Sequence, residues 1–132
     1  MAGFETVIQL AIINTLKANA ELVALAGIYD SVPQTTVYPY VIIGDDFGVD
    51  ESTDDFIRRE TISTIHSWSR DRGREETKLI QGYLDEILNR TELTMVGYSN
   101  TLIHIQSSDS FLEAGGKTRH GIVNFKLITK RI

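Results

Sequence analysis

One strongly amphipathic segment near the middle of the chain constrains the fold most. Its apolar side chains fall on one face of a helix and its charged side chains fall elsewhere, which is the pattern of a helix that packs against a core. The apolar face comprises Leu79, Ile80, Tyr83, Leu84, Ile87 and Leu88. A β-like stretch over residues 56–68 precedes the helix, and the connecting turn places Asp71 as a plausible N-cap. A strand followed by a core-facing helix is therefore the central unit.

The apolar periodicity of the rest of the chain predicts further helices and strands, which together with this unit form an α+β domain. Residues 3–27 have helical spacing with a broad apolar face, and residues 18–21 are a candidate break between a long and a short piece. Further strands are predicted at 40–44, 101–106 and 122–129. The order of elements favours two helices packed on one face of a mainly antiparallel sheet of about four strands. We expect one domain over residues 1–132, with Trp68 closing the end of the core.

Composition narrows the classes of function. The chain has no cysteine, so disulfides and thiolate metal sites are excluded. With 13 Lys and Arg against 18 Asp and Glu, the net charge is −5, which argues against tight binding of nucleic acid phosphates. The sequence shows neither a signal-peptide pattern nor an apolar run long enough to cross a bilayer, so we expect a soluble chain without membrane contact.

Catalytic and cofactor motifs are not recognisable. His66, His104 and His120 could converge as metal ligands, but their spacing matches no metal motif, and ordinary sheet or surface histidines are the default interpretation. No serine lies in a nucleophile elbow. Residues 115–118, Gly-Gly-Lys-Thr, imitate the end of a phosphate loop, but Phe111 stands where that loop requires glycine. We therefore predict no catalytic residues, no metal and no cofactor.

The turn between the strand and the central helix is a candidate subunit interface. It carries Arg70, Arg72 and Arg74, close to the only tryptophan. Tryptophan and arginine are enriched where protein subunits meet. Two other interpretations remain open, namely a grip on nucleic acid and simple pairing of the arginines with nearby Glu75 and Glu76.

An acidic segment precedes the β-like stretch. Its six carboxylates are Asp45, Asp46, Asp50, Glu51, Asp54 and Asp55. The register does not match a calcium-binding EF-hand loop, so a solvated hairpin tip is the favoured interpretation. We expect this loop to project from the sheet.

Four segments, taken in order, resemble a known family. They are Tyr29–Gln34, Tyr38–Gly44, His66–Arg74 and Thr118–Phe125. Together they resemble the tail-completion, or tail-terminator, proteins of long-tailed phages and prophages, over nearly the whole chain. The resemblance implies a structural subunit, not an enzyme, that forms a ring, typically a hexamer, at the head-proximal end of the tail tube.

The resemblance also implies partners and a location. Such rings end tube polymerisation and join the tail to the head connector, so the partners are further copies of the chain, the tail tube protein and the head connector protein. The location is the virion, after assembly in the bacterial host cytoplasm. DNA passes through the ring without specific binding, and acidic groups facing the lumen would repel its phosphates. The six carboxylates are therefore predicted to face the lumen or an axial partner.

Three alternatives stay open at the level of sequence. A head-tail connector or neck protein has a similar size and also forms rings. A small regulatory module that binds a host protein belongs to a different class. An uncharacterised hydrolase would need a convergent site that the sequence does not show.

Overall fold

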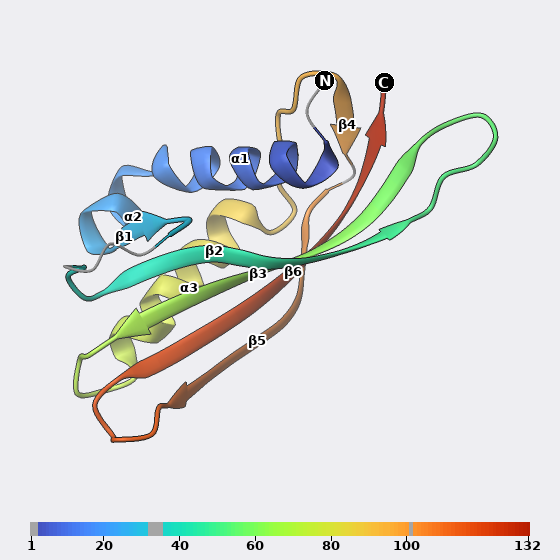
Figure 1. The fold of residues 1–132 in the computed structure, drawn as a ribbon. Helices are drawn as coiled ribbons and strands as arrows, with labels where there is room; N and C mark the ends of the chain where they lie inside the picture. Colours follow the sequence, from blue (N-terminus) through green and yellow to red (C-terminus); the bar gives the residue numbers. More distant parts are fainter. Residues whose placement is uncertain (1–2, 32–35, 101) are drawn as a thin grey trace.

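The computed structural model describes residues 3–31, 36–100 and 102–132, and these form an α+β domain with three helices and six strands (Figure 1). The helices are α1 (Phe4–Lys17), α2 (Ala20–Leu25) and α3 (Glu75–Leu88). The strands are β1 (Gly27–Tyr29), β2 (Tyr40–Asp50), β3 (Arg58–Ser69), β4 (Tyr98–Asn100), β5 (His104–Leu112) and β6 (Arg119–Arg131). The predicted fold class is confirmed, whereas the predicted element counts are too low.

The six strands form one mixed sheet in the order β1-β2-β3-β6, with β4 and β5 both paired to β6. β5 pairs with residues 119–126 of β6 and β4 with residues 129–131, so the two strands share one edge. β1 is parallel to β2, and every other pairing is antiparallel. The prediction missed β1 and β4 because each spans only three residues and shows no readable alternation.

The structure confirms the predicted break in the first helical segment and corrects the start of the central helix. The break separates α1 from α2, and Asn19 caps α2 by accepting a hydrogen bond from the Leu22 amide at 2.9 Å. Asp71 is not the N-cap of α3: the helix begins at Glu75, and the Asp71 carboxylate accepts a bond from the Arg72 amide instead. The Tyr38–Pro39 peptide bond is cis. The segment between β1 and β2 includes residues 32–35, which lie outside the described residues.

The core lies between the helices and one face of the sheet. In β3 the buried positions alternate, and Thr61, Ser63, Ile65 and Ser67 face the helices. The largest fully buried side chains include Ile12 and Leu16 of α1, Leu84 of α3 and Phe125 of β6. Leu79, predicted on the core face of its helix, is instead 48% exposed. Figure 1 shows α1 and α2 over β2, and α3 behind β3 and β6.

Gly121 of β6 sets how closely α3 approaches the sheet. A Cβ at this position would lie 2.4 Å from Ser67 Oγ and 3.1 Å from Thr77 Cγ2, with Gln81 Nε2 at 2.9 Å. Thr77 and Gln81 belong to α3. Small side chains on the helix-facing side of β3 and the glycine of β6 therefore let the helix backbone pack close to the strands.

A β-bulge in β2 redirects its side chains. The register with β3 shifts between Gly44 and Asp46, so Val41 and Ile43 point to the core, whereas Phe47 pairs with Ile62 on the opposite face. Beyond the bulge, β2 and β3 continue as a long hairpin whose end extends past the helices (Figure 1). No helix of the described part of the chain is long and apolar enough to span a membrane.

Candidate assembly surfaces

The face of the sheet opposite the helices carries a row of four aromatic rings on four strands. Tyr40, Trp68, His120 and Phe111 are cross-strand neighbours on β2, β3, β6 and β5. The ring centroids of Trp68 and His120 are 3.7 Å apart and stacked, those of Tyr40 and Trp68 are 6.4 Å apart, and those of Phe111 and His120 are 5.1 Å apart. We call these residues the aromatic row. The described helices leave this face of the sheet uncovered.

The prediction that Trp68 closes the core is wrong. Trp68 points to the same side as Ile62 and His66, whereas the core side of β3 carries Ser67 and Ser69. The close approach of α3 favours small residues on the core side, so the bulky ring lies on the other face. Within the described residues, the Trp68 indole nitrogen is buried without a hydrogen-bond partner.

Two of the three histidines meet beside the aromatic row. His120 Nδ1 lies 2.8 Å from Glu113 Oε1, and His120 Nε2 lies 2.7 Å from His66 Nδ1. When His120 is neutral and donates its Nδ1 proton to the carboxylate, its Nε2 accepts a hydrogen bond from His66. Burial is the main influence on His120 and lowers its pKa; the hydrogen bond to Glu113 opposes this, and the charge of His66 adds to the lowering.

The structure does not bring the three histidines together. His104 is exposed and lies beside Lys126, away from the other two histidines. Among the residues the structure describes, no group of three or more histidine and carboxylate side chains is arranged to hold a metal ion. The histidine pair is instead a pair of sheet residues joined by a hydrogen bond. Sequence spacing could not reveal it, because the two residues are 54 positions apart on neighbouring strands.

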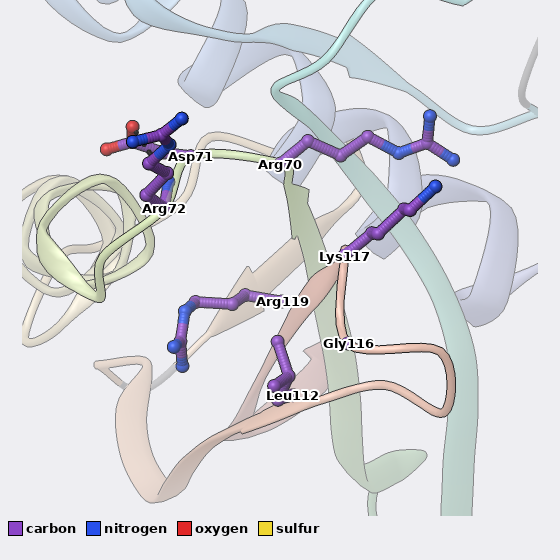
Figure 2. Close-up of a pocket in the computed structure, with 7 residues that line it drawn as sticks. All are labelled: Arg70, Asp71, Arg72, Leu112, Gly116, Lys117 and Arg119. Atoms are coloured by element: carbon purple, nitrogen blue, oxygen red, sulfur yellow. Dashed lines mark hydrogen bonds between the residues drawn. The ribbon is translucent and has the colours of Figure 1, made fainter.

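A surface pocket of ≈ 480 Å³ lies where β3 leaves the sheet and the β5–β6 turn begins. It is lined by Arg70, Asp71, Arg72, Leu112, Gly116, Lys117 and Arg119 (Figure 2). Figure 2 shows the side chains of Arg70 and Lys117 extending in a similar direction from two different segments. We call the pocket with its four cationic residues, Arg70, Arg72, Lys117 and Arg119, the basic pocket.

The structure divides the three arginines predicted as a subunit interface. Arg70 and Arg72 line the basic pocket, whereas Arg74 does not and is the N-cap residue of α3. Arg70 lies over the Tyr38 ring at 4.4 Å and donates to Thr118 Oγ1 at 3.3 Å. Lys117 of the β5–β6 turn and Arg119 at the start of β6 were not predicted, because they reach the pocket only through antiparallel pairing.

The acidic segment is placed mostly on the long hairpin. Asp46 and Asp50 belong to β2 instead of a loop, and the loop proper begins at Glu51 and includes Asp54 and Asp55. The backbone of Asp45 is also in β2, but its side chain lies outside the described part of the structure. We call residues 46–57 the acidic arm. Whether the arm faces a lumen or an axial partner stays a prediction.

The acidic arm also carries exposed apolar side chains. Phe47 is 63% exposed, and Val49 and Ile57 are each 44% exposed. Three apolar residues on a hairpin that extends beyond the helices favour a contact with another molecule. The described residues also leave strand edges without a partner, among them the edge of β2 beyond Ile42, where its pairing with β1 ends, and the outer edge of β5.

Comparison with known proteins places this arrangement in a family. No curated protein matches the sequence. The chain shares its fold with a chain of a structure described as a virion of a native gene transfer agent particle, with a TM-score of 0.90 and 18% identity, over 98% of this chain and 99% of that one. The family model of the tail completion protein gp17 matches residues 10–130. The resemblance seen in the sequence is therefore confirmed, and the chain belongs to the tail completion protein gp17 family, a family of structural phage-tail proteins and not of enzymes.

Proposed function

We propose that this tail protein caps the head-proximal end of the tail tube as a ring, ends tube polymerisation and joins the tail to the head connector. The observation that carries the proposal is the family match over residues 10–130. The exposed apolar side chains of the projecting arm, the exposed Phe111 of the aromatic row and the open strand edges support it, because a subunit that works alone rarely leaves such surfaces free. A hexamer is the expected ring.

The subunit contacts of this ring are proposed to use the open strand edges and the turn that carries Arg70, Arg72 and Arg74. A ring with cyclic symmetry joins two different surfaces of each subunit, head to tail. Arg70 and Arg72 of the turn line one pocket with Leu112 of β5, and the open edge of β2 lies on the other side of the β3–β6 pair from β5. The chain thus presents two different surfaces, as a head-to-tail ring requires.

The proposed ring lets DNA pass without holding it. The net charge of −5 disfavours retention of a polyanion in a channel. The carboxylates of the acidic arm (Asp46, Asp50, Glu51, Asp54 and Asp55), together with Asp45, are the candidates for a surface that faces the lumen or an axial partner. A ring structure with the arm on its outer circumference would remove that assignment.

Binding to isolated tail parts tests the proposal. Purified protein is incubated separately with tail tubes and with head connectors, and each mixture is examined by negative-stain electron microscopy. A ring at one end of the tubes supports the terminator function. Rings that bind only the connectors would favour the alternative, a connector or neck protein, and binding to neither would contradict both functions. Light scattering after size-exclusion chromatography gives the number of subunits in the free protein.

A further inference from the structure

We infer that the basic pocket of one subunit receives the acidic arm of the neighbouring subunit. The inference rests on the proposed ring and names the two surfaces that close it. In this arrangement the arm contacts a second copy of the chain, instead of facing the lumen or an axial protein.

The cations of the basic pocket have no ion-pair partner among the side chains that the structure describes. Arg70, Arg72, Lys117 and Arg119 form no ion pair with any described carboxylate, a set that leaves out Asp45. The guanidinium Nε of Arg119 is buried and has no hydrogen-bond partner in that part of the chain. Asp71 is the only acidic residue of the pocket lining, and its carboxylate bonds the Arg72 amide. Arginine side chains without an ion-pair partner are available to bind carboxylates, which they do through paired hydrogen bonds.

The acidic arm has the complementary charge. Asp46, Asp54 and Asp55 are exposed, and the described residues offer none of them an ion pair. Glu51 and Arg58 form the one ion pair at the arm's end, with a separation of 3.7 Å and both side chains partly exposed. Such an exposed pair contributes little to the stability of the subunit. Most of the arm's negative charge is therefore available for contact with another molecule.

The two surfaces also match in their apolar residues. Phe47 and Val49 of the arm are 63% and 44% exposed. Beside the basic pocket, Leu112 at the end of β5 lines the pocket and is 47% exposed. Contact of Phe47 and Val49 with Leu112 would remove apolar surface from water while the charges meet, which is the combination found in stable protein interfaces.

The positions of the two surfaces require the contact to be between subunits. The arm lies at one end of the sheet and the β5–β6 turn at the other (Figure 1). β3 runs between them for 12 residues, which is roughly 40 Å of extended chain. One subunit therefore cannot fill its own pocket. Joining opposite ends of identical subunits is a heterologous contact, the kind that closes rings.

Nucleic acid is the competing occupant of the pocket. Arginine and lysine side chains also bind phosphates, and the pocket lies next to an aromatic row. The net charge of −5 opposes the approach of a polyanion. The neighbouring subunit is favoured because the chain itself supplies the matching charge.

A charge exchange between the two surfaces tests the inference. The pocket variant carries Arg70→Glu and Lys117→Glu, and the arm variant carries Asp54→Lys and Asp55→Lys; all four side chains are exposed, so the fold is expected to persist. Matched controls are Lys78→Glu and Asp85→Lys on the exposed side of α3. Self-association is measured by sedimentation velocity, and ring formation is measured on tail tubes.

Each reversed variant alone is expected to self-associate at least tenfold more weakly than the wild type, and both controls are expected to match the wild type. An equal mixture of the two variants should recover assembly, because each acidic arm then meets a basic pocket and each basic arm an acidic pocket. Rings from either variant alone, or a mixture no better than its parts, would overturn the inference. In that case rings at tube ends would still support the proposed function.

Cross-linking gives a second test that does not depend on ring stability. Because the chain has no cysteine, Asp54→Cys and Lys117→Cys proteins can be mixed and joined by a short bismaleimide. A heterodimer is expected in clear excess over a mixture of Asp54→Cys with Lys78→Cys. An equal yield from both mixtures, with and without tail tubes, contradicts the contact. A pocket variant that assembles normally but loses DNA binding of the wild type would assign the pocket to nucleic acid instead.

Discussion

Trp68 and His120 stack on the side of the sheet that the helices leave uncovered, with their ring centroids 3.7 Å apart and their planes inclined by 16°. The two residues are direct cross-strand partners on β3 and β6. Close cross-strand pairs of this kind stabilise a sheet through side-chain contact. The same histidine bonds Glu113 and His66, so its protonation connects the charge of this face to the stability of the fold.

The lowered pKa of His120 predicts a loss of stability in acid. Burial holds the folded-state pKa below that of the unfolded chain, which is about 6.5. As the pH falls below about 6.5, the unfolded chain binds a proton before the folded chain does, so the free energy of unfolding decreases toward the folded-state pKa. Urea unfolding between pH 8 and pH 5, followed by Trp68 fluorescence, measures this.

The His120→Gln variant should show a weaker pH dependence than the wild type over that range. His104→Gln is the matched control, because His104 is exposed and remote from the histidine pair. Identical pH profiles for wild type and His120→Gln would contradict a contribution from His120.

The close approach of α3 to β6 predicts that Gly121→Ala is destabilising. The added Cβ would meet Ser67 Oγ at 2.4 Å, and Thr77 of the helix limits how far the neighbours can move. Overpacking of this kind costs about 1–3 kcal/mol of unfolding free energy. Gly82→Ala in α3 is the control: a Cβ there meets nothing within 4 Å, so a gain of about 0.5–1 kcal/mol is expected. Equal stability of the two variants in urea would show that the helix does not pack this closely.

Two leucines of α3 are predicted to differ in their contribution to stability, although both belong to the amphipathic pattern. Leu84 is fully buried, so Leu84→Ala should cost about 2–5 kcal/mol. Leu79 is 48% exposed, and Leu79→Ala should change stability by less than about 0.5 kcal/mol. Chemical denaturation of the two variants measures the change in the free energy of unfolding for each. A large loss for Leu79→Ala would mean that the helix is rotated toward that side.

The cap of α2 predicts a smaller effect. Asn19 accepts the Leu22 amide, and no other side chain is shown to replace that bond. Asn19→Ala should lower stability by about 1 kcal/mol, whereas Asn19→Asp, which keeps the acceptor, should stay close to the wild type. Thermal unfolding of both variants provides the measurement, and a stable alanine variant would show that the cap is dispensable.

Periodicity predicted the long elements well and the contacts between them poorly. The helical pattern of residues 79–88 identified α3, because a continuous apolar stripe is a strong local signal. The bulge after Gly44 was not predictable, because apolar residues stand at every second position of the sequence on both sides of it. The bulge nevertheless moves the apolar side chains that follow it from the core face of β2 to the opposite face. Trp68 was misplaced because size alone suggested the core, whereas the glycine at position 121 requires small residues on the helix side.

At the candidate surfaces, too, groups of residues close in sequence were predicted, and contacts between distant segments were not. Arg70 and Arg72 were predicted because they lie two positions apart in one turn, and Lys117 and Arg119 were missed because pairing of β3 with β6 brings them in from the far end of the chain. The carboxylates between residues 45 and 55 were identified as a group. Their division between β2 and the loop depends on hairpin length, which local propensity does not determine.

Tail tube length is the most direct test of the central claim that this protein ends tube growth. Purified tube protein is polymerised with increasing amounts of the wild-type chain, and tube lengths are measured by electron microscopy. The account predicts shorter tubes, each with a ring at one end, and no further growth when fresh tube protein is added. Tubes that keep growing with the protein bound at their ends, or that bind it only along their sides, would contradict the claim.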